Sequence, residues 1–126
     1  MIANDIDSVA LHIARLNAEA NDLPLQTDGT NLLDADVPPV DVVLAAEMFY
    51  EKDEASRMGA FLDRAHARGA TVLIADAGRP FAPGPGMDVL LRRTVPANRD
   101  LEGVAERTVQ ILQRGSGVIR IYGPIE

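Results

Sequence analysis

The first helical pattern in the chain runs over Ser8–Asn21, where apolar residues recur every three or four positions. Either Asp7 or Ser8 can serve as the N-cap, because both side chains can accept a hydrogen bond from an N–H group of the first turn. Pro24 prevents the helix from continuing. The opposite face is polar, so the pattern predicts an amphipathic helix. Its apolar positions are Val9, Ile13, Leu16 and Ala20.

A second helical pattern runs from about Asp53 to Arg68. Basic residues fall in its last turns, where positive charge suits the helix dipole, and Gly69 stands at the position that favours glycine just after a helix. This segment is therefore predicted to be a second amphipathic helix. Its apolar stripe comprises Ala55, Met58, Phe61, Leu62 and Ala65.

Two segments are β-branched and almost continuously apolar, Val40–Ala45 and Thr71–Ala75. This composition is typical of strands that are buried on both faces of a parallel sheet. Shorter candidates are the apolar start of the chain, Met1–Ala3, and the segment Leu23–Gln26, while the polar residues Thr27–Asn31 predict a loop. Alternation of strands with helices indicates an α/β fold.

The pattern changes in the last third of the chain. Two β-rich runs, Leu90–Val95 and Thr108–Leu112, flank the acidic segment Asn98–Glu106, which does not predict a good helix. We therefore expect an antiparallel pair at the edge of the sheet. We also expect the domain to span residues 1–113, followed by a tail at 114–126 that is either an extra strand or disordered.

Composition excludes several kinds of chemistry. The 126 residues include 12 basic and 19 acidic ones, a net charge of −7, and no cysteine. The lack of cysteine excludes disulfides, thiolate zinc sites, iron–sulfur clusters and cysteine nucleophiles. The acidic balance argues against nucleic-acid binding. The longest apolar run, Val42–Ala46, is too short to span a bilayer, and the sequence shows no signal peptide. The sequence thus predicts a cytoplasmic protein that binds neither nucleic acid nor membrane.

Polar side chains follow each predicted strand, and they are Asp5, Asn31, Glu47 and Asp76. In open α/β sheets the ligand crevice lies outside the carboxyl ends of the strands. A carboxylate there can accept hydrogen bonds from ribose hydroxyls, and an amide can pair with an adenine edge. The alternative is that Asp5 or Asp7 only caps a helix. A glycine-rich phosphate turn between a strand and a helix is not found, since Gly84–Gly86 follows no strand directly and Gly115–Gly117 precedes a β-like run.

Several segments together resemble one family. Residues 2–112 are similar, in order, to the seven-strand (class I) S-adenosylmethionine-dependent methyltransferases. They are most similar to the branch that includes the lysine methyltransferase of the electron-transfer flavoprotein β subunit, whose bacterial members are often labelled nicotinamide N-methyltransferase-like. The segments that carry the resemblance are Ala3–Asp7, Arg15–Asn21, Val40–Leu44, Ala46–Glu51, Val72–Pro80, Val95–Pro96, Leu101–Glu102 and Arg107–Val109.

The resemblance implies a role for each matching residue. S-adenosylmethionine would be the cofactor, bound by Asp5 at the ribose, Asn31 near the adenine, and Ala46. The catalytic residues would be Glu47 and Tyr50, which shape the cleft for the cofactor and the acceptor lysine. Asp76, Gly78 and Arg79 would line the substrate side, and no metal is implied. The partner would be a protein with a target lysine, or a small molecule with a nitrogen acceptor.

The chain also departs from the family. Glu47 stands where aspartate is more usual, and Ala75 and Ala77 replace the more usual glycine and proline. The family has a first strand, a glycine-rich motif and a first helix before the acid at Asp5, but only four residues precede Asp5 here. The resemblance thus implies a Rossmann-like methyltransferase sheet, mostly parallel with a C-terminal antiparallel hairpin, that lacks the first strand and first helix.

We therefore expect an N-terminally truncated methyltransferase that is inactive alone and binds S-adenosylmethionine very weakly or not at all. One alternative is a non-catalytic remnant that interacts with another chain, or with itself as a homo-oligomer, through an unpaired sheet edge. A further alternative is a different small α/β nucleotide-binding module.

Overall fold

The computed structural model describes residues 1–46, 48–49, 51–77 and 87–115 of the chain. These residues fall into two compact units, Met1–Asp36 and a second one that begins at Val37. Each unit has its own sheet, and the two are described separately below. Most of the predicted tail, from residue 116 onward, lies outside the described residues.

The first unit is a strand–helix–strand unit. Strand β1 (Ile2–Asn4) pairs in parallel with β2 (Gln26–Asp28), and helix α1 (Ser8–Ala20) connects them. A single 3-10 turn, η1 (Leu32–Asp34), follows β2. The predicted helix is confirmed to within one residue, and Asp7 is its N-cap: Oδ1 of Asp7 accepts a hydrogen bond of 2.8 Å from the Val9 N–H.

The prediction of a strand at Leu23–Gln26 was wrong in its position, and the loop predicted at Thr27–Asn31 was wrong at Thr27 and Asp28. The strand begins at Gln26 and includes Thr27 and Asp28, because these residues are in register with β1. Leu23 belongs instead to the turn that ends α1, where its N–H donates to the Ala18 carbonyl over 2.9 Å.

Helix α1 is apolar on two opposite faces. Leu11 is 7% exposed and lies near Gly29 and β2, on the side that also carries the half-buried Ala14 and Ala18. The stripe predicted from the sequence is on the other side, and its member Ile13 is 51% exposed. The stripe was therefore wrong as the inward face, since the small residues around Leu11 fit more closely against a two-stranded sheet.

The second unit has a four-stranded sheet with the order β3-β4-β6-β5. Strands β3 and β4 are parallel, whereas β6 pairs antiparallel with both β4 and β5. The predicted mixed α/β sheet with a C-terminal antiparallel hairpin is confirmed. One short helix, α3, stands where no good helix was expected. The elements are β3 (Val42–Ala46), α2 (Lys52–Ala67), β4 (Thr71–Asp76), β5 (Met87–Pro96), α3 (Arg99–Glu102) and β6 (Glu106–Arg114).

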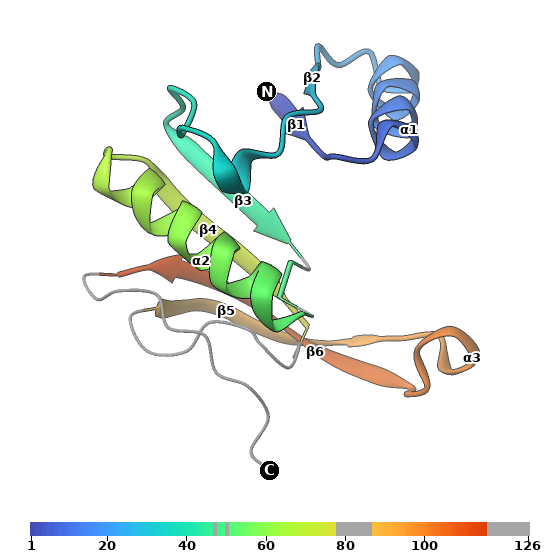
Figure 1. Cartoon of the computed structure of the whole chain (residues 1–126). Coiled ribbons are helices and arrows are strands. Elements are labelled where there is room, and N and C mark those ends of the chain that lie inside the picture. Colours follow the sequence, from blue (N-terminus) through green and yellow to red (C-terminus); the bar gives the residue numbers. More distant parts are fainter. Residues whose placement is uncertain (47, 50, 78–86, 116–126) are drawn as a thin grey trace. The chain divides into compact units, whose positions relative to one another are not determined.

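Helix α2 covers one face of this sheet (Figure 1). All five residues of its predicted apolar stripe are buried, and so are Val72 and Ile74 of β4 and Leu112 of β6. The helix gives way to β4 at Gly69, whose φ of +94° is a conformation that glycine adopts without strain. The core of the unit therefore lies between α2 and the sheet.

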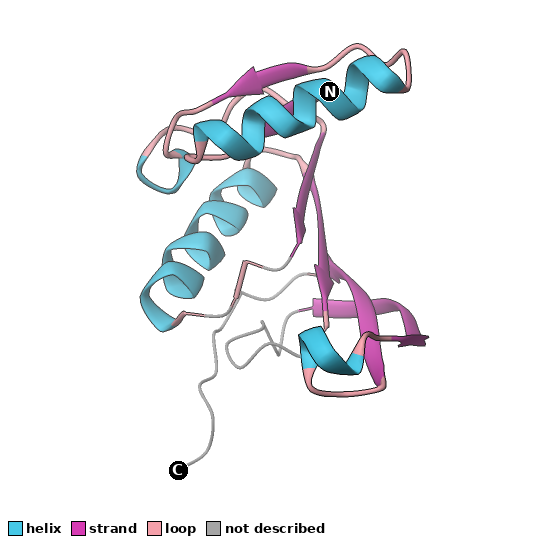
Figure 2. Cartoon of the chain, turned by 90° about the vertical axis from the view of Figure 1, so that its right-hand side faces the viewer, coloured by secondary structure: helices cyan, strands magenta, loops and turns pink. Residues whose placement is uncertain are grey.

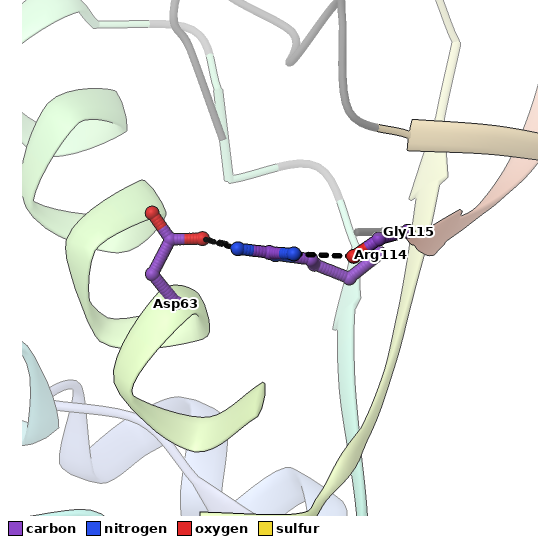
Figure 3. Close-up of polar contacts among 3 residues, drawn as sticks. All are labelled: Asp63, Arg114 and Gly115. Atoms are coloured by element: carbon purple, nitrogen blue, oxygen red, sulfur yellow. Dashed lines mark hydrogen bonds and ion pairs between the residues drawn. The ribbon is translucent and has the colours of Figure 1, made fainter. Parts of the chain in front are cut away.

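An ion pair joins α2 to the end of β6 (Figure 3). Nη2 and Nε of Arg114 each lie 3.1 Å from Oδ1 of Asp63, and Nη1 of Arg114 also donates to the Gly115 carbonyl. The Arg114 side chain is only 8% exposed, so these acceptors, and not water, must stabilise its positive charge. The contact fixes the last strand of the sheet against the helix that precedes β4.

Replacing Asp63 with alanine should lower the free energy of unfolding of the second unit by about 1–3 kcal/mol, because a nearly buried guanidinium loses an acceptor. Urea denaturation measures this change. The double variant D63A/R114M should recover part of the loss, because it removes the uncompensated charge as well. The single variant R114M completes the comparison. If the loss of stability in D63A/R114M equals the sum of the losses in D63A and R114M, the ion pair does not stabilise the unit.

Candidate functional site

Asp5 lies directly after β1, at the carboxyl end of the first sheet. Its backbone N–H donates to the Asp28 carbonyl over 3.2 Å, and its Oδ1 accepts from the Asp7 N–H over 2.9 Å. The side chain is exposed, and within the described part of the chain its Oδ2 makes no hydrogen bond. Asp5 therefore supports the turn into α1 with one oxygen and can accept a hydrogen bond from a ligand with the other.

Asn31 stands three residues after β2 and begins η1. Its Oδ1 accepts from the Leu33 N–H over 3.2 Å, so the side chain is the N-cap of this turn. Because β1 and β2 are parallel neighbours, Asp5 and Asn31 both follow strand ends at the same edge of the first sheet. The structure thus brings these two predicted cofactor residues to one side of the unit.

Two further residues of this edge, Asn4 and Asp28, were not predicted from the sequence. Nδ2 of Asn4 donates to the carbonyls of both Asp28 and Thr30, each over 2.9 Å, and so ties the two strand ends together. Oδ1 of Asp28 accepts from the Thr30 N–H over 2.9 Å. The backbone and side-chain hydrogen bonds from Thr30 lower the pKa of Asp28. A strand placed at Gln26–Asp28 would have marked Asp28 as a strand-end acid.

The second sheet also ends in predicted site residues. Ala46 is the last residue of β3 and pairs in register with Ala75, so it is a neighbour of Asp76, the last residue of β4. Asp76 is 5% exposed, and it is the one buried acidic residue in the part of the chain that the structure describes. Ala46 and Asp76 therefore lie together at the carboxyl edge of the parallel pair.

The remaining predicted residues lie outside the described part of the chain: Glu47, Tyr50, Gly78 and Arg79. Between the first two, Phe49 is fully buried. Phe49 therefore belongs to the core, and in the sequence it stands between the two predicted catalytic residues.

Two further features of the described residues bear on the chemistry. They contain no group of three or more histidine, aspartate or glutamate side chains arranged to hold a metal ion. Neither α1 nor α2 is long and apolar enough to cross a membrane, nor is any other helix within the described ranges. What the two edges do present are carboxylates and an amide at the ends of parallel strands, where α/β sheets bind their ligands.

The α/β fold is that of solved class I S-adenosylmethionine-dependent methyltransferases. The N-methyltransferase NodS from Bradyrhizobium japonicum WM9 matches with a TM-score of 0.57 and 12% identity, over 91% of this chain and 73% of that chain. TehB from Haemophilus influenzae matches with a TM-score of 0.58 and 13% identity, over 91% of this chain and 49% of that chain. An S-adenosylmethionine-dependent methyltransferase from Clostridium acetobutylicum ATCC 824 has a TM-score of 0.51 and 9% identity, over 91% and 75%.

The curated proteins with similar sequences share one more specific name. The electron transfer flavoprotein beta subunit lysine methyltransferase of Xenopus laevis is 37% identical over 81 residues, which are 63% of this chain and 33% of that protein. The Homo sapiens protein of the same name is 34% identical over 97 residues, which are 75% of this chain and 37% of that protein. The chain spans about a third of the length of these relatives, and no family model matches it. The predicted α/β fold is confirmed, and the predicted methyltransferase class and S-adenosylmethionine cofactor agree with the names of these relatives and solved structures.

Replacing Asp28 with asparagine should change how the stability of the first unit depends on pH. The pKa of Asp28 is lower in the folded chain, so its carboxylate stabilises the fold above the usual aspartate pKa. This contribution is lost as the pH falls through the lowered value. D28N should therefore reduce the loss of stability between neutral and acidic pH, measured by thermal unfolding. The same acid dependence in D28N and in the unmodified chain would contradict this role.

Proposed function

We propose that this chain forms the nucleoside-binding and acceptor-binding edges of a protein-lysine N-methyltransferase. The observation that carries the proposal is the 33–37% identity with lysine methyltransferases over 63–75% of the chain, compared with 9–16% for the solved methyltransferase structures. The class I fold and the acids at the strand ends support it. A small-molecule nitrogen is the second candidate acceptor.

In the first unit, Asp5 and Asn31 would hold the nucleoside part of the cofactor. The Oδ2 of Asp5 has no partner among the described residues and can accept hydrogen bonds from the ribose hydroxyls. The Nδ2 of Asn31 can donate to the adenine edge, because its Oδ1 is already engaged by Leu33. The bonds of Asn4 to Asp28 and Thr30 would keep both strand ends in place.

In the second unit, the carboxyl ends of β3 and β4 would serve the acceptor. Ala46 is small, so a ligand can approach the backbone closely there, and we assign Asp76, Gly78 and Arg79 to the acceptor side. A lysine must lose its proton before its lone pair can attack a methyl group, and the reacting atoms must be held about 3–3.5 Å apart. We assign proton removal and alignment to Glu47 and Tyr50. The cofactor supplies the electrophilic methyl group.

The 126 residues alone would bind the cofactor only weakly. No strand among the described residues is followed by a glycine-rich turn and a helix, which is the element that approaches the rest of a nucleotide ligand in α/β folds. The span of about a third of the curated relatives supports the same conclusion. We therefore propose that this chain needs a further segment to be active.

A non-catalytic interaction subunit is the alternative function. It is favoured by one observation: β3 pairs with a single strand among the described residues, and its Leu44 is 69% exposed. Self-association through this edge would produce a dimer, which light scattering detects.

The role of Asp5 is tested by titrating the isotopically labelled chain with S-adenosylmethionine and following its amide resonances. We expect shifts at Asp5 and Asn31 with a dissociation constant of about 1 mM or weaker, which corresponds to roughly −4 kcal/mol. Asp5→Asn should remove them, because the amide replaces a ribose-binding carboxylate. Glu19→Gln makes the same change on the exposed face of α1 and should not alter binding.

Two outcomes would contradict the proposal. Shifts confined to residues far from the strand ends would refute the nucleoside role of Asp5 and Asn31. Binding tighter than about 10 μM would refute the idea that the cofactor site of this chain is incomplete, because the chain would then bind the cofactor well without a further segment.

A further inference from the structure

Three strands of the second sheet carry polar residues in one row. Asp76 of β4 pairs in register with Gln110 of β6, which in turn pairs with Arg92 of β5. Side chains of residues paired in register point to the same face of a sheet, and along one strand they alternate. Asp76 therefore shares the face of the buried residues Val72 and Ile74, which is the face that α2 covers (Figure 2). The three residues are here called the polar row.

The polar row marks the place where the hairpin of β5 and β6 leaves the rest of the sheet. Asp76 is the last residue of β4, whereas β5 and β6 continue for four further pairs, as far as Pro96 and Glu106 (Figure 1). Strand β6 is antiparallel to both β4 and β5, so the hairpin continues beyond the carboxyl end of β4. A ligand at that end therefore has Gln110 and Arg92 as its next neighbours along the sheet.

The guanidinium of Arg92 is held by Gln110 in a defined orientation. Oε1 of Gln110 accepts hydrogen bonds from Nε and Nη2 of Arg92 over 2.8 and 2.9 Å, and it is the amide oxygen that faces the guanidinium because arginine can only donate. In the described part of the chain Arg92 makes no other hydrogen bond, and it is exposed. The end of the guanidinium formed by Nη1 and Nη2 therefore keeps two parallel N–H groups, which match the two oxygens of a carboxylate.

The partner of Arg92 orients the charge without neutralising it. Arg114, in the same sheet, is nearly buried, and its charge is compensated by the carboxylate of Asp63. Arg92 instead pairs with a neutral amide, so its full positive charge is retained at the surface. An arginine that is held in place before a ligand arrives loses less side-chain entropy when it binds. The pair of Arg92 and Gln110 is therefore suited to binding an anion.

We propose that Arg92, held in place by the positioning residue Gln110, binds a carboxylate of the methyl acceptor. The inference rests on the proposed function for the location of the acceptor at the ends of β3 and β4. Asp76 and Arg92 are two strand spacings apart, about 10 Å, which is the length of about three extended residues. The acceptor is then a protein segment with an acidic residue within about three positions of the target lysine. Nicotinamide has no carboxylate and does not fit this site.

Two peptides that differ only in charge test the proposal on the full chain. Both have about nine residues, blocked ends and a central lysine; the second and third positions on either side are glutamate in one and glutamine in the other. Amide resonances of the labelled chain give the two dissociation constants. We expect the glutamate peptide to bind at least about five-fold more tightly, although the net charge of the chain, −7, repels it.

The preference for the glutamate peptide should depend on one of two adjacent arginines. Arg92→Ala should abolish the preference, because it removes the donors of the polar row. Arg93→Ala removes the same charge from the opposite face of β5, also at an exposed position, and should leave the preference unchanged. Arg92→Lys should keep only part of it, since an ammonium lacks the two parallel donors.

Gln110 is tested by two variants with different expected results. Gln110→Leu should reduce the preference at least about three-fold, because Arg92 remains but is no longer oriented. Gln110→Glu should nearly abolish it, because an internal carboxylate then neutralises the guanidinium. A merely structural role of Gln110 would weaken the binding of both peptides equally and would overturn its assignment as a positioning residue. Circular dichroism confirms that each variant folds.

The remaining outcomes separate this inference from the proposed function. Equal binding of the two peptides by the unmodified chain, no binding of the glutamate peptide at about 5 mM, or an unchanged preference in Arg92→Ala would overturn the inference. S-adenosylmethionine also carries a carboxylate; if it displaces the glutamate peptide and shifts the resonances of Arg92, the assignment to the acceptor is overturned. A preference that depends on Arg92 in a chain that does not bind S-adenosylmethionine would support the inference and contradict only the proposed function.

Discussion

The parallel pairing of β3 with β4 determines most of what the second unit can do. Parallel strands are connected by helices and are stable when both of their faces are covered. Here α2 buries Val72 and Ile74 on one face, while Leu44 on the other face remains exposed. The same pairing brings Ala46 and Asp76 to one edge of the sheet. A single set of backbone contacts therefore defines both the predicted acceptor edge and the face on which Leu44 is exposed.

The first unit repeats this arrangement on a smaller scale. β1 and β2 are parallel and joined by α1, and hydrogen bonds from Asn4 to Asp28 and Thr30 hold their carboxyl ends together. Helix α1 carries apolar residues on two opposite sides, of which the sheet contacts the one with Leu11. A helix that is apolar on both sides is typical of one that lies between two layers. In each unit, therefore, one apolar surface is buried and another is exposed.

Much of the fold could be predicted from the sequence, because the strongest patterns were local. The stripe from Ala55 to Ala65 has clear helical periodicity, and the strand that ends at Asp76 has a continuous apolar run. The error at Leu23–Gln26 has a different origin. The position of β2 is set by its register with β1, a contact across more than twenty residues that no local pattern contains. For the same reason Asn4 and Asp28 were missed as members of the first strand edge, whereas Asp5 and Asn31 were found. The inward side of α1 was misjudged because alanines near Leu11 give a weaker signal than the larger residues on the opposite side.

Methyl transfer is the most direct test of the central claim, that these residues form the nucleoside and acceptor edges of a lysine methyltransferase. In a hybrid enzyme, the aligned residues of this chain replace the 81 matched residues of the Xenopus laevis relative. The hybrid is incubated with methyl-labelled S-adenosylmethionine and either the electron transfer flavoprotein β subunit or nicotinamide, with the unmodified relative as a positive control. The account predicts label on lysine residues of the protein. Label on nicotinamide alone would assign the chain to a small-molecule acceptor, and a folded hybrid that methylates neither would contradict the claim.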